Sequence, residues 1–475
     1  MSRTLIKDLR SHIGEKVTLY GWVDTRRDHG KLIFLDLRDF SGTLQAVIIP
    51  KEVDAHVAAG EVRSEWVVQM HGLVNKRPEK MVNPELPMGD IELSVTGLSV
   101  ITKAETPPFD IAGDGRELDE ELRLKYRYLD LRRPRLAKNL RMRHAFIREV
   151  RDFLSHEGFV EVETPILTKS TPEGARDYVV PSRIDKGEFY ALPQSPQQYK
   201  QLLMVAGIER YFQIAKCLRD EDTRGDRQPE FTQLDIEMSF ITQEDILSLT
   251  ERMFTGIVEK LYPEKRIIKK PWPRISYVEA MANYGNDKPD LRENKNDPNE
   301  LAFGWVLDFP LFEPEKANGP ASAKASAGKH FAPSHHMFTA PREEDIGKLD
   351  TDPHAVRAYQ HDLVLNGYEV GGGSIRIHDS ALQSKIFDLI GFDDADKENF
   401  KHMLTAFSYG VPPHGGIAPG LDRLLMILQN EPNIREVIAF PKTGEGRDLM
   451  MGAPSSIKEA QLKELGISIT KNKKV

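Results

Sequence analysis

Apolar and polar residues alternate in five short runs between residues 16 and 105, and this pattern predicts a small β-barrel. Side chains at every second position of a strand point to the same face, so each run can bury one face and expose the other. One stretch, residues 53–65, has helical rather than alternating spacing and predicts an inserted helix. The five predicted strands are residues 17–23, 32–37, 44–49, 66–71 and 91–95.

A second alternating pattern, in residues 211–218 and 231–238, predicts an antiparallel β-hairpin. The loop between the two runs contains Thr223, Gly225 and Pro229, which are common turn residues. An arginine on a rigid strand can hold a phosphate or carboxylate with two hydrogen bonds, and a phenylalanine offers an apolar face to a planar base. The segment could equally be a solvated turn with local ion pairs. The mouth of the hairpin carries Arg219, Asp220, Glu221, Arg227, Gln228 and Phe231.

The apolar run 424–428 predicts a helix that begins after Gly420 and carries Arg423 in its first turn. The helix dipole disfavours a cation at that end, so a bound anion is the more economical explanation for the arginine. Other helical patterns cover residues 145–156, 241–265 and 457–465.

Asp362 and Glu369 flank Asn366-Gly367, a strong signal for a two-residue hairpin turn. Across such a turn the two carboxylates could converge, and hard oxygen ligands together with phosphates suit Mg²⁺. The alternative is an ordinary pair of surface acids.

The two adjacent histidines His335 and His336 have no cysteine partners, so they do not indicate a zinc site.

Two segments lack clear periodicity. Residues 106–137 are rich in Pro, Asp, Glu and Arg and predict a hinge between domains. Within them, residues 122–133 are basic and partly helical, which fits either a solvated amphipathic helix or an RNA contact. Residues 314–329 consist mainly of Ala, Ser, Lys and Gly and predict a flexible loop.

Composition limits the class of protein. A chain of 475 residues predicts two or three domains, and 40% hydrophobic with 29% charged residues is typical of a globular protein. No apolar run approaches the roughly 20 residues of a membrane span, and the first residues do not resemble a signal peptide. The single cysteine, Cys217, excludes an internal disulfide and fits a cytoplasmic location. A net charge of −8 neither indicates nor excludes nucleic-acid binding, because a local basic face suffices.

Several strings together resemble the signature motifs of class II aminoacyl-tRNA synthetases, and specifically those of the bacterial-type aspartyl family. They are Thr171-Pro-Glu-Gly-Ala-Arg-Asp177, Gln194-Ser-Pro-Gln-Gln-Tyr-Lys200, Arg219-Asp-Glu-Asp222, Tyr368-Glu-Val-Gly-Gly-Gly-Ser374 and Gly420-Leu-Asp-Arg423.

The resemblance implies an α+β protein: an OB-type barrel that binds the anticodon, followed by an antiparallel-sheet catalytic domain. The insertion domain usual in the family is reduced here to a short loop near residues 293–302. A homodimer, formed around Pro165, is also implied. The expected domains are residues 1–105 (barrel), 106–137 (hinge), 138–432 (catalytic domain) and 433–475 (C-terminal extension).

The same resemblance implies roles for individual residues. Arg219, Glu369 and Arg423 would be catalytic, with Arg219 on the α-phosphate and Arg423 on the γ-phosphate of ATP. Asp362 and Glu369 would hold Mg²⁺. L-aspartate would meet Glu173, Gln197, Lys200, Arg219, Asp235, His335 and Arg376. ATP would meet Arg219, Asp220, Glu221, Gln228, Phe231, Glu369, Gly420, Leu421, Asp422 and Arg423, with adenine between Phe231 and Arg423. The tRNA would meet Arg27, His29, Phe34, Gln45 and Lys80.

Further contacts on the barrel could come from Arg26 and Arg38, and Phe34 could instead be a core residue. An OB-type barrel that binds single strands combines such basic groups with aromatic stacking.

Selection of aspartate over asparagine follows from charge. Lys200 and Arg376 would face the substrate's side-chain carboxylate, and a neutral amide there would leave both cations unpaired.

Three readings compete with an enzyme specific for tRNA(Asp). The enzyme could also charge tRNA(Asn), a choice expected to depend on His29 and Lys80. The chain could instead be an amide-forming paralogue that needs no tRNA, or an RNA-binding protein with a decayed catalytic domain.

Overall fold

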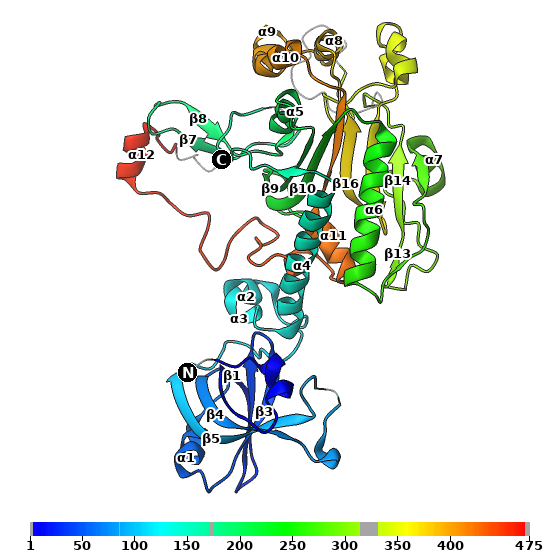
Figure 1. Ribbon diagram of the computed structural model, residues 1–475. Coiled ribbons are helices and arrows are strands. Elements are labelled where there is room, and N and C mark those ends of the chain that lie inside the picture. The colour runs from blue at the N-terminus through cyan, green and yellow to red at the C-terminus, as the bar shows by residue number, and fades with distance from the viewer. Residues whose placement is uncertain (1–2, 85, 172–173, 314–330, 471–475) are drawn as a thin grey trace. The chain divides into compact units, whose positions relative to one another are not determined.

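The structure, a computed structural model, describes residues 3–84, 86–171, 174–313 and 331–470. Glu173 and the whole predicted flexible loop 314–329 lie outside these residues. The chain separates into two compact units, Met1–Glu117 and Leu118–Val475 (Figure 1). Subdivision of the second unit at residues 138 and 432 stays a prediction.

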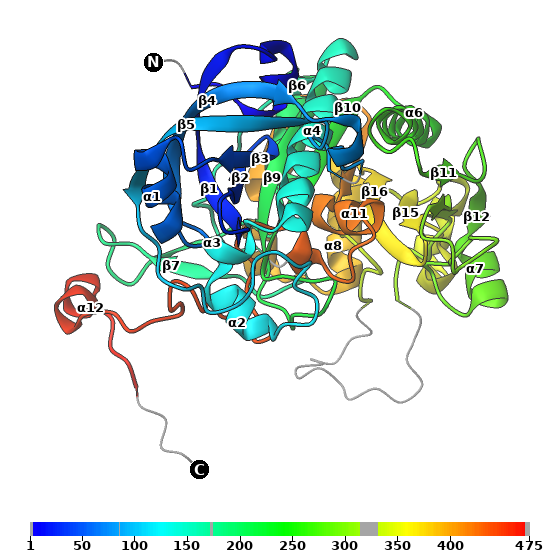
Figure 2. The ribbon, with the colours of Figure 1, turned by 90° about the horizontal axis from the view of Figure 1, so that it is seen from below.

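The first unit is a closed five-stranded barrel with the strand order β1-β2-β3-β5-β4, which confirms the predicted OB-type fold (Figure 2). Its strands alternate as expected: in β2, Ile33, Leu35 and Leu37 point into the core, whereas Phe34 and Asp36 point outward. The elements are η1 (Ile6–His12), β1 (Lys16–Asp28), β2 (Ile33–Asp39), β3 (Gly42–Ile48), α1 (Val53–Glu61), β4 (Val67–Lys76), η2 (Glu79–Met81) and β5 (Ile91–Thr102).

The second unit is built on an eight-stranded sheet with the order β12-β14-β15-β16-β17-β10-β9-β6. The strands from β14 to β9 pair antiparallel, and only the outermost pairs, β12 with β14 and β6 with β9, are parallel. This mixed sheet with its helices confirms the α+β class. The strands are β6 (Val160–Glu161), β7 (Val179–Pro181), β8 (Phe189–Ala191), β9 (Arg210–Leu218), β10 (Glu230–Ser239), β11 (Arg266–Ile267), β12 (Arg274–Ser276), β13 (Glu300–Leu301), β14 (Phe303–Leu307), β15 (Gln360–Leu365), β16 (Tyr368–Ile375) and β17 (His414–Pro419).

The helices of this unit include two long ones, α4 and α6, which pack on each other against the sheet (Figures 1 and 2). The α-helices are α2 (Glu120–Lys125), α3 (Arg127–Asp130), α4 (Pro134–His156), α5 (Gln197–Val205), α6 (Gln243–Leu261), α7 (Tyr277–Tyr284), α8 (Ser380–Ile390), α9 (Asp394–Glu398), α10 (Lys401–Ser408), α11 (Leu421–Leu428) and α12 (Glu459–Leu465). The 3₁₀ helices are η3 (Glu343–Asp350), η4 (Pro353–Ala355) and η5 (Ile434–Glu436).

Helix α4 begins at Pro134, eleven residues before the start that the apolar pattern predicts. Proline suits the first helical turn because its missing N–H would be unpaired there anyway. The polar Asn139 occupies the buried face between Leu136 and Phe146 and donates to Glu431, so it interrupts the apolar spacing that marks a helix in sequence.

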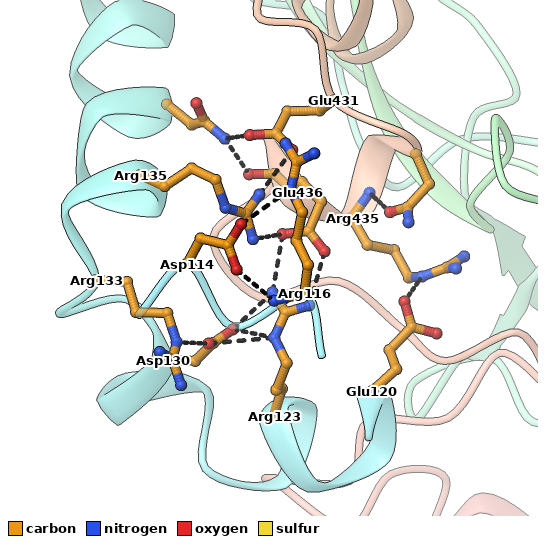
Figure 3. Close-up of polar contacts among 12 residues, drawn as sticks. Asp114, Arg116, Glu120, Arg123, Asp130, Arg133, Arg135, Glu431, Arg435 and Glu436 are labelled. Carbon is orange, nitrogen blue, oxygen red and sulfur yellow. Dashed lines mark hydrogen bonds and ion pairs between the residues drawn. The ribbon is translucent and has the colours of Figure 1, made fainter. Parts of the chain in front are cut away.

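The basic segment 122–133 buries three of its arginines inside the protein. Arg123, Arg127 and Arg133 are each at most 5% exposed, and all three donate to the fully buried carboxylate of Asp130. Arg123 also donates two hydrogen bonds, of 3.0 and 2.8 Å, to Glu436 near the end of the chain (Figure 3). These arginines therefore fasten α2 and α3 to η5, so the segment is not a simple solvated helix, whereas an RNA contact through its exposed Lys125 stays a prediction.

Strand β10 has two chemically different faces, and this difference places the site. Leu234, Ile236 and Met238 face the core formed with α4, α6 and α11. Asp235 and Glu237 lie at the alternate positions and therefore face the other side of the sheet, where α5 packs.

Candidate active site

A cavity of about 440 Å³ lies on the polar side of the sheet, between β9, β10, β16, α5 and the start of α11. This volume falls within the range of ligand-binding clefts. The structure brings to its wall thirteen residues predicted from sequence: Gln197, Lys200, Arg219, Glu221, Gln228, Phe231, Asp235, His335, Glu369, Arg376, Gly420, Asp422 and Arg423. Their individual roles stay predictions.

Two residues predicted to bind ATP turn their side chains elsewhere. Leu421 is fully buried in the apolar core, so only its backbone at the start of α11 remains for such a role. Asp220 pairs its carboxylate with Arg176 at 3.5 Å and its backbone N–H with the Arg176 carbonyl.

Four buried charges form a cluster at the floor of the cavity: Lys200, Asp235 and Arg376 line it, and Glu237 contacts both cations from behind. Lys200 Nζ lies 2.7 Å from Asp235 Oδ1 and 3.3 Å from Glu237 Oε2. Arg376 donates to both oxygens of Glu237, at 3.0 and 3.2 Å, and to Ser374 Oγ at 2.6 Å. Burial would raise the pKa of Glu237, but Arg376 and Lys200 outweigh it and hold that pKa at about 2. Burial raises the pKa of Asp235, although Lys200 opposes the shift.

The sequence analysis missed Glu237, which pairs with two residues of the cavity wall and changes the charge argument. The sequence analysis counted Lys200 and Arg376 as two cations that await a substrate carboxylate, whereas the structure pairs both with Glu237. An ammonium has three N–H groups and a guanidinium has five, so both still hold donors that no described residue uses. A usable signal was available: Glu237 follows Asp235 by two positions and must share its strand face.

Arg219 and Arg423 hold positions that differ in detail from the expectation. The guanidinium of Arg219 lies 5.1 Å from the ring centroid of Phe231, whereas the prediction paired that ring with Arg423. Arg423 instead reaches Asp226, at 3.1 Å, and donates to the Glu369 carbonyl. These contacts offset the unfavourable helix dipole without a bound anion. The Arg423 Nε–H is buried and has no hydrogen-bond partner among the described residues, so this donor remains available to a bound anion.

The predicted hairpin around Asn366-Gly367 is confirmed. Both residues have positive φ angles, +51° and +85°, as a two-residue hairpin turn of this kind requires. A bulge between Leu363 and Val364 shifts the register.

The hairpin brings the two predicted metal-binding carboxylates together. A Cβ added at Gly372 would lie 3.2 Å from Asp362 Oδ1 and 3.6 Å from Glu369 Oε1. Asp362 is buried and Glu369 opens into the cavity, so they are not an ordinary pair of surface acids. Partial removal from water and the nearby Asp362 carboxylate raise the pKa of Glu369. A cation between the Asp362 and Glu369 carboxylates would relieve their repulsion.

His335 lies beside these acids, with Nε2 3.4 Å from Asp362 Oδ2. The described residues contain no group of three or more His, Cys, Asp or Glu side chains arranged for a metal ion. A divalent cation here would therefore need further oxygen ligands from a bound phosphate or from water, as Mg²⁺ commonly has.

On the outer face of the barrel, four of the five predicted RNA contacts lie together. Arg27 pairs with Asp36 at 2.6 Å and donates to Gln45 at 3.4 Å. The rings of His29 and Phe34 meet edge to face at 5.5 Å. Phe34 is partly exposed on this face and is not a core residue.

Two other barrel residues differ from the expectation. Arg38 is largely buried and pairs with Glu65 and Asp24, each within 2.8 Å, so it is not available to RNA. Arg26 donates to the Ala59 carbonyl and to Asp28. Lys80 is exposed on η2. The sequence analysis missed Glu92, which accepts a hydrogen bond from Gln45 at 3.5 Å.

Each of the two units matches the model of a known protein family. Residues 119–444 match the model of class II tRNA synthetases (D, K and N), and residues 17–101 match that of the OB-fold nucleic-acid-binding domain. Since the first match covers more than half of the chain, the chain belongs to the class II tRNA synthetases.

Within that class, the chain belongs to the family of aspartate–tRNA ligases. It is 45% identical to "Aspartate--tRNA(Asp/Asn) ligase" of Rubrobacter xylanophilus, over 97% of this chain and 95% of that protein. It is 41% identical to "Aspartate--tRNA ligase" of Staphylococcus epidermidis, over 96% and 97%. The first alignment spans 583 positions, more than the 475 residues of this chain, so the relative contains residues that have no counterpart here.

Solved structures share the fold. The asparaginyl-tRNA synthetase of Pyrococcus horikoshii, complexed with asparaginyl-adenylate, superposes with a TM-score of 0.73 at 24% identity, over 93% of this chain and 98% of that one. The aspartyl-tRNA synthetase of Entamoeba histolytica superposes with a TM-score of 0.70 at 24% identity, over 93% of this chain and 91% of that one.

In the described parts of the chain, no helix has both the length and the apolar character to cross a membrane.

Proposed function

We propose that this chain activates L-aspartate with ATP and transfers the aspartyl group to the 3′ end of tRNA(Asp). The observation that carries the proposal is the cluster of Lys200, Asp235, Glu237 and Arg376 on the cavity floor. The remaining N–H donors of the two cations suit the side-chain carboxylate of aspartate, and Asp235 Oδ2, which has no hydrogen-bond partner within 3.5 Å among the described residues, suits its ammonium group. An asparagine amide in the same place would set its NH₂ group against these donors.

The rest of the cavity suits ATP. Arg219 would hold the α-phosphate and the attacking carboxylate, which repel each other until a cation lies between them. Arg423 would donate its buried Nε–H, which no described residue accepts, to the γ-phosphate. Phe231 would provide the apolar face for adenine. Asp362 and Glu369 would hold Mg²⁺, which when bound neutralises charge on the triphosphate.

The test is aminoacylation of separate tRNA(Asp) and tRNA(Asn) transcripts with labelled aspartate and ATP. We expect aspartyl-tRNA(Asp) to form. Pyrophosphate exchange dependent on aspartate, without charging of either transcript, would favour the paralogue that needs no tRNA. Neither exchange nor charging would favour an RNA-binding protein with a decayed catalytic domain.

The same assay tests the barrel face. Phe34→Ala removes the ring expected to stack on an anticodon-loop base, which is worth about 1–3 kcal/mol per base. We therefore expect a higher KM for tRNA and unchanged pyrophosphate exchange. Leu32→Ala, a change at another exposed apolar residue outside the predicted contacts, is the matched control.

A second candidate is an enzyme that also charges tRNA(Asn). The relatives from Rubrobacter xylanophilus and Dehalococcoides mccartyi bear the name "Aspartate--tRNA(Asp/Asn) ligase", whereas those from staphylococci bear the name "Aspartate--tRNA ligase". Charging of both transcripts would establish the broader specificity and would assign loose anticodon reading to the region of His29 and Lys80.

We also propose a homodimer formed around Pro165. Strand β6 is an edge of the eight-stranded sheet, and the segment after it exposes Ile166 and Leu167 by 45% and 52%. Exposed apolar side chains beside an open strand edge are typical of an interface. Analytical ultracentrifugation should give twice the chain mass of 53.9 kDa for the unmodified protein. Leu167→Lys should shift it toward the monomer, and a monomer without any substitution would refute the proposal.

A cytoplasmic location completes the proposal, since the substrates ATP and tRNA are found there. Cys217 is buried and forms no disulfide within the described residues, so it needs no oxidising compartment.

A further inference from the structure

Two glutamine amides and one histidine imidazole form a buried line of hydrogen bonds that ends at the cavity. His414, at the start of β17, contacts Gln201 on α5 with 3.1 Å between His414 Nε2 and Gln201 Nε2. Gln197, one turn earlier on α5, contacts Gln201 with 3.0 Å between Gln197 Nε2 and Gln201 Oε1. Gln201 and His414 are fully buried, and Gln197 lines the cavity at 5% exposure.

The far end of the line fixes the tautomer of the imidazole. His414 Nδ1 lies 2.8 Å from the Pro412 carbonyl oxygen, which can only accept, so Nδ1 must carry the proton. Burial lowers the pKa of His414 to about 4, with Arg376 and His378 acting in the same direction against Glu237. The ring is therefore neutral at pH 7, and its Nε2 can only accept a hydrogen bond.

Each amide then has one allowed orientation. Because His414 Nε2 accepts, Gln201 must present its NH₂ group to it and its carbonyl oxygen to Gln197. Because that oxygen accepts, Gln197 must turn its own NH₂ group toward Gln201. The carbonyl oxygen of Gln197 is left over, and it has no hydrogen-bond partner among the described residues.

We infer that His414 is a positioning residue that acts through Gln201 to aim the Gln197 carbonyl oxygen at the ammonium group of the amino-acid substrate. This inference rests on the proposed function, in which Asp235 receives that ammonium, and it adds Gln197, on the same cavity wall, as a second acceptor. An amide flipped by 180° would present an NH₂ group to a cation. The line of hydrogen bonds thus ensures that the ammonium group meets the carbonyl oxygen of Gln197 and not its NH₂ group. Only Gln197 touches the substrate; Gln201 and His414 act through it.

Two substitutions at His414 separate the hydrogen bond from the ring. His414→Phe keeps a ring of similar size and removes the acceptor, so both amides can flip. His414→Gln can place its carbonyl oxygen near the former Nε2 and keeps the acceptor. We expect His414→Phe to raise the KM for aspartate about ten- to hundred-fold, the range of a hydrogen bond to a charged group. The KM for ATP should be unchanged, and His414→Gln should restore the KM for aspartate nearly to its original value.

The experiment is pyrophosphate exchange with aspartate and ATP varied in turn, for each variant alone and combined with Gln197→Ala. If His414 acts through Gln197, His414→Phe has no further effect in the Gln197→Ala background. His402→Phe, the same change on the surface of α10, is the control. If His414→Phe does not fold, Gln201→Met breaks the same line from α5 and should raise the same KM.

The inference is overturned if His414→Phe leaves the KM for aspartate unchanged or raises it additively with Gln197→Ala. It is also overturned if Gln197→Ala itself has no effect. Absence of any aspartate-dependent exchange in the unmodified protein would instead refute the proposed function, so the two failures are distinguishable.

Discussion

Replacing Lys200 with leucine is expected to abolish most aspartate activation while leaving ATP binding nearly intact. The substitution removes the cation between Asp235 and Glu237, and both carboxylates are fully buried. Breaking a buried ion pair from one side costs about 3–5 kcal/mol. Part of that cost falls on aspartate binding, because the substrate would add a third negative charge beside the two.

The measurement is kcat/KM for aspartate from pyrophosphate exchange, compared with the dissociation constant for ATP from direct titration. We expect kcat/KM for aspartate to fall by at least a hundred-fold, roughly the effect of 3 kcal/mol. Lys216→Leu, at an exposed lysine on the neighbouring strand β9, is the matched control and should change neither quantity. Equal losses in aspartate activation and ATP binding would show that Lys200 does not serve the substrate carboxylate.

Replacing Asp130 with asparagine is expected to lower the free energy of unfolding of the second unit by about 3–5 kcal/mol. Asp130 is fully buried and accepts from Arg123 and Arg133 (Figure 3) and from Arg127. All three arginines are nearly inaccessible to water. An amide of the same shape cannot neutralise three guanidinium groups and would turn an N–H group toward at least one of them.

Urea-induced unfolding followed by circular dichroism checks this expectation. Asp350→Asn is the matched control, since Asp350 pairs with Lys385 at the surface, where the two side chains are 70% and 36% exposed. A surface pair of this kind contributes at most about 1 kcal/mol. Similar midpoints for both variants would mean that the Asp130 cluster does not stabilise the fold.

The strands were predictable because their signal is local. Apolar residues at every second position mark the barrel strands, and an Asn-Gly pair is enough to specify the turn between β15 and β16. The start of α4 was not predictable in the same way. Its buried face holds Asn139, whose partner Glu431 lies 292 residues further along the chain. Apolar spacing cannot reveal a helix face that is buried through hydrogen bonds.

The candidate site divides in a similar manner. Motif resemblance identified Lys200, Asp235 and Arg376, and the tertiary structure brings all three to one cavity. Glu237 was overlooked because its partner Arg376 is 139 residues away and its own neighbours are apolar. Arg423 was explained by a bound anion because its partner Asp226, on the loop after β9, becomes visible only when that loop and α11 meet.

The sequence by itself determined the two kinds of unit, the strands of the barrel and central hairpin, and the set of residue types needed for the site. These features depend on side-chain periodicity and on short motifs, which act between near neighbours. Only the tertiary structure decided which buried charged and polar groups are paired: Glu237 with both floor cations, Asp130 with three arginines, and His414 with Gln201. A buried charge or amide must find its partner wherever the fold provides one, and in this chain those partners come from distant segments.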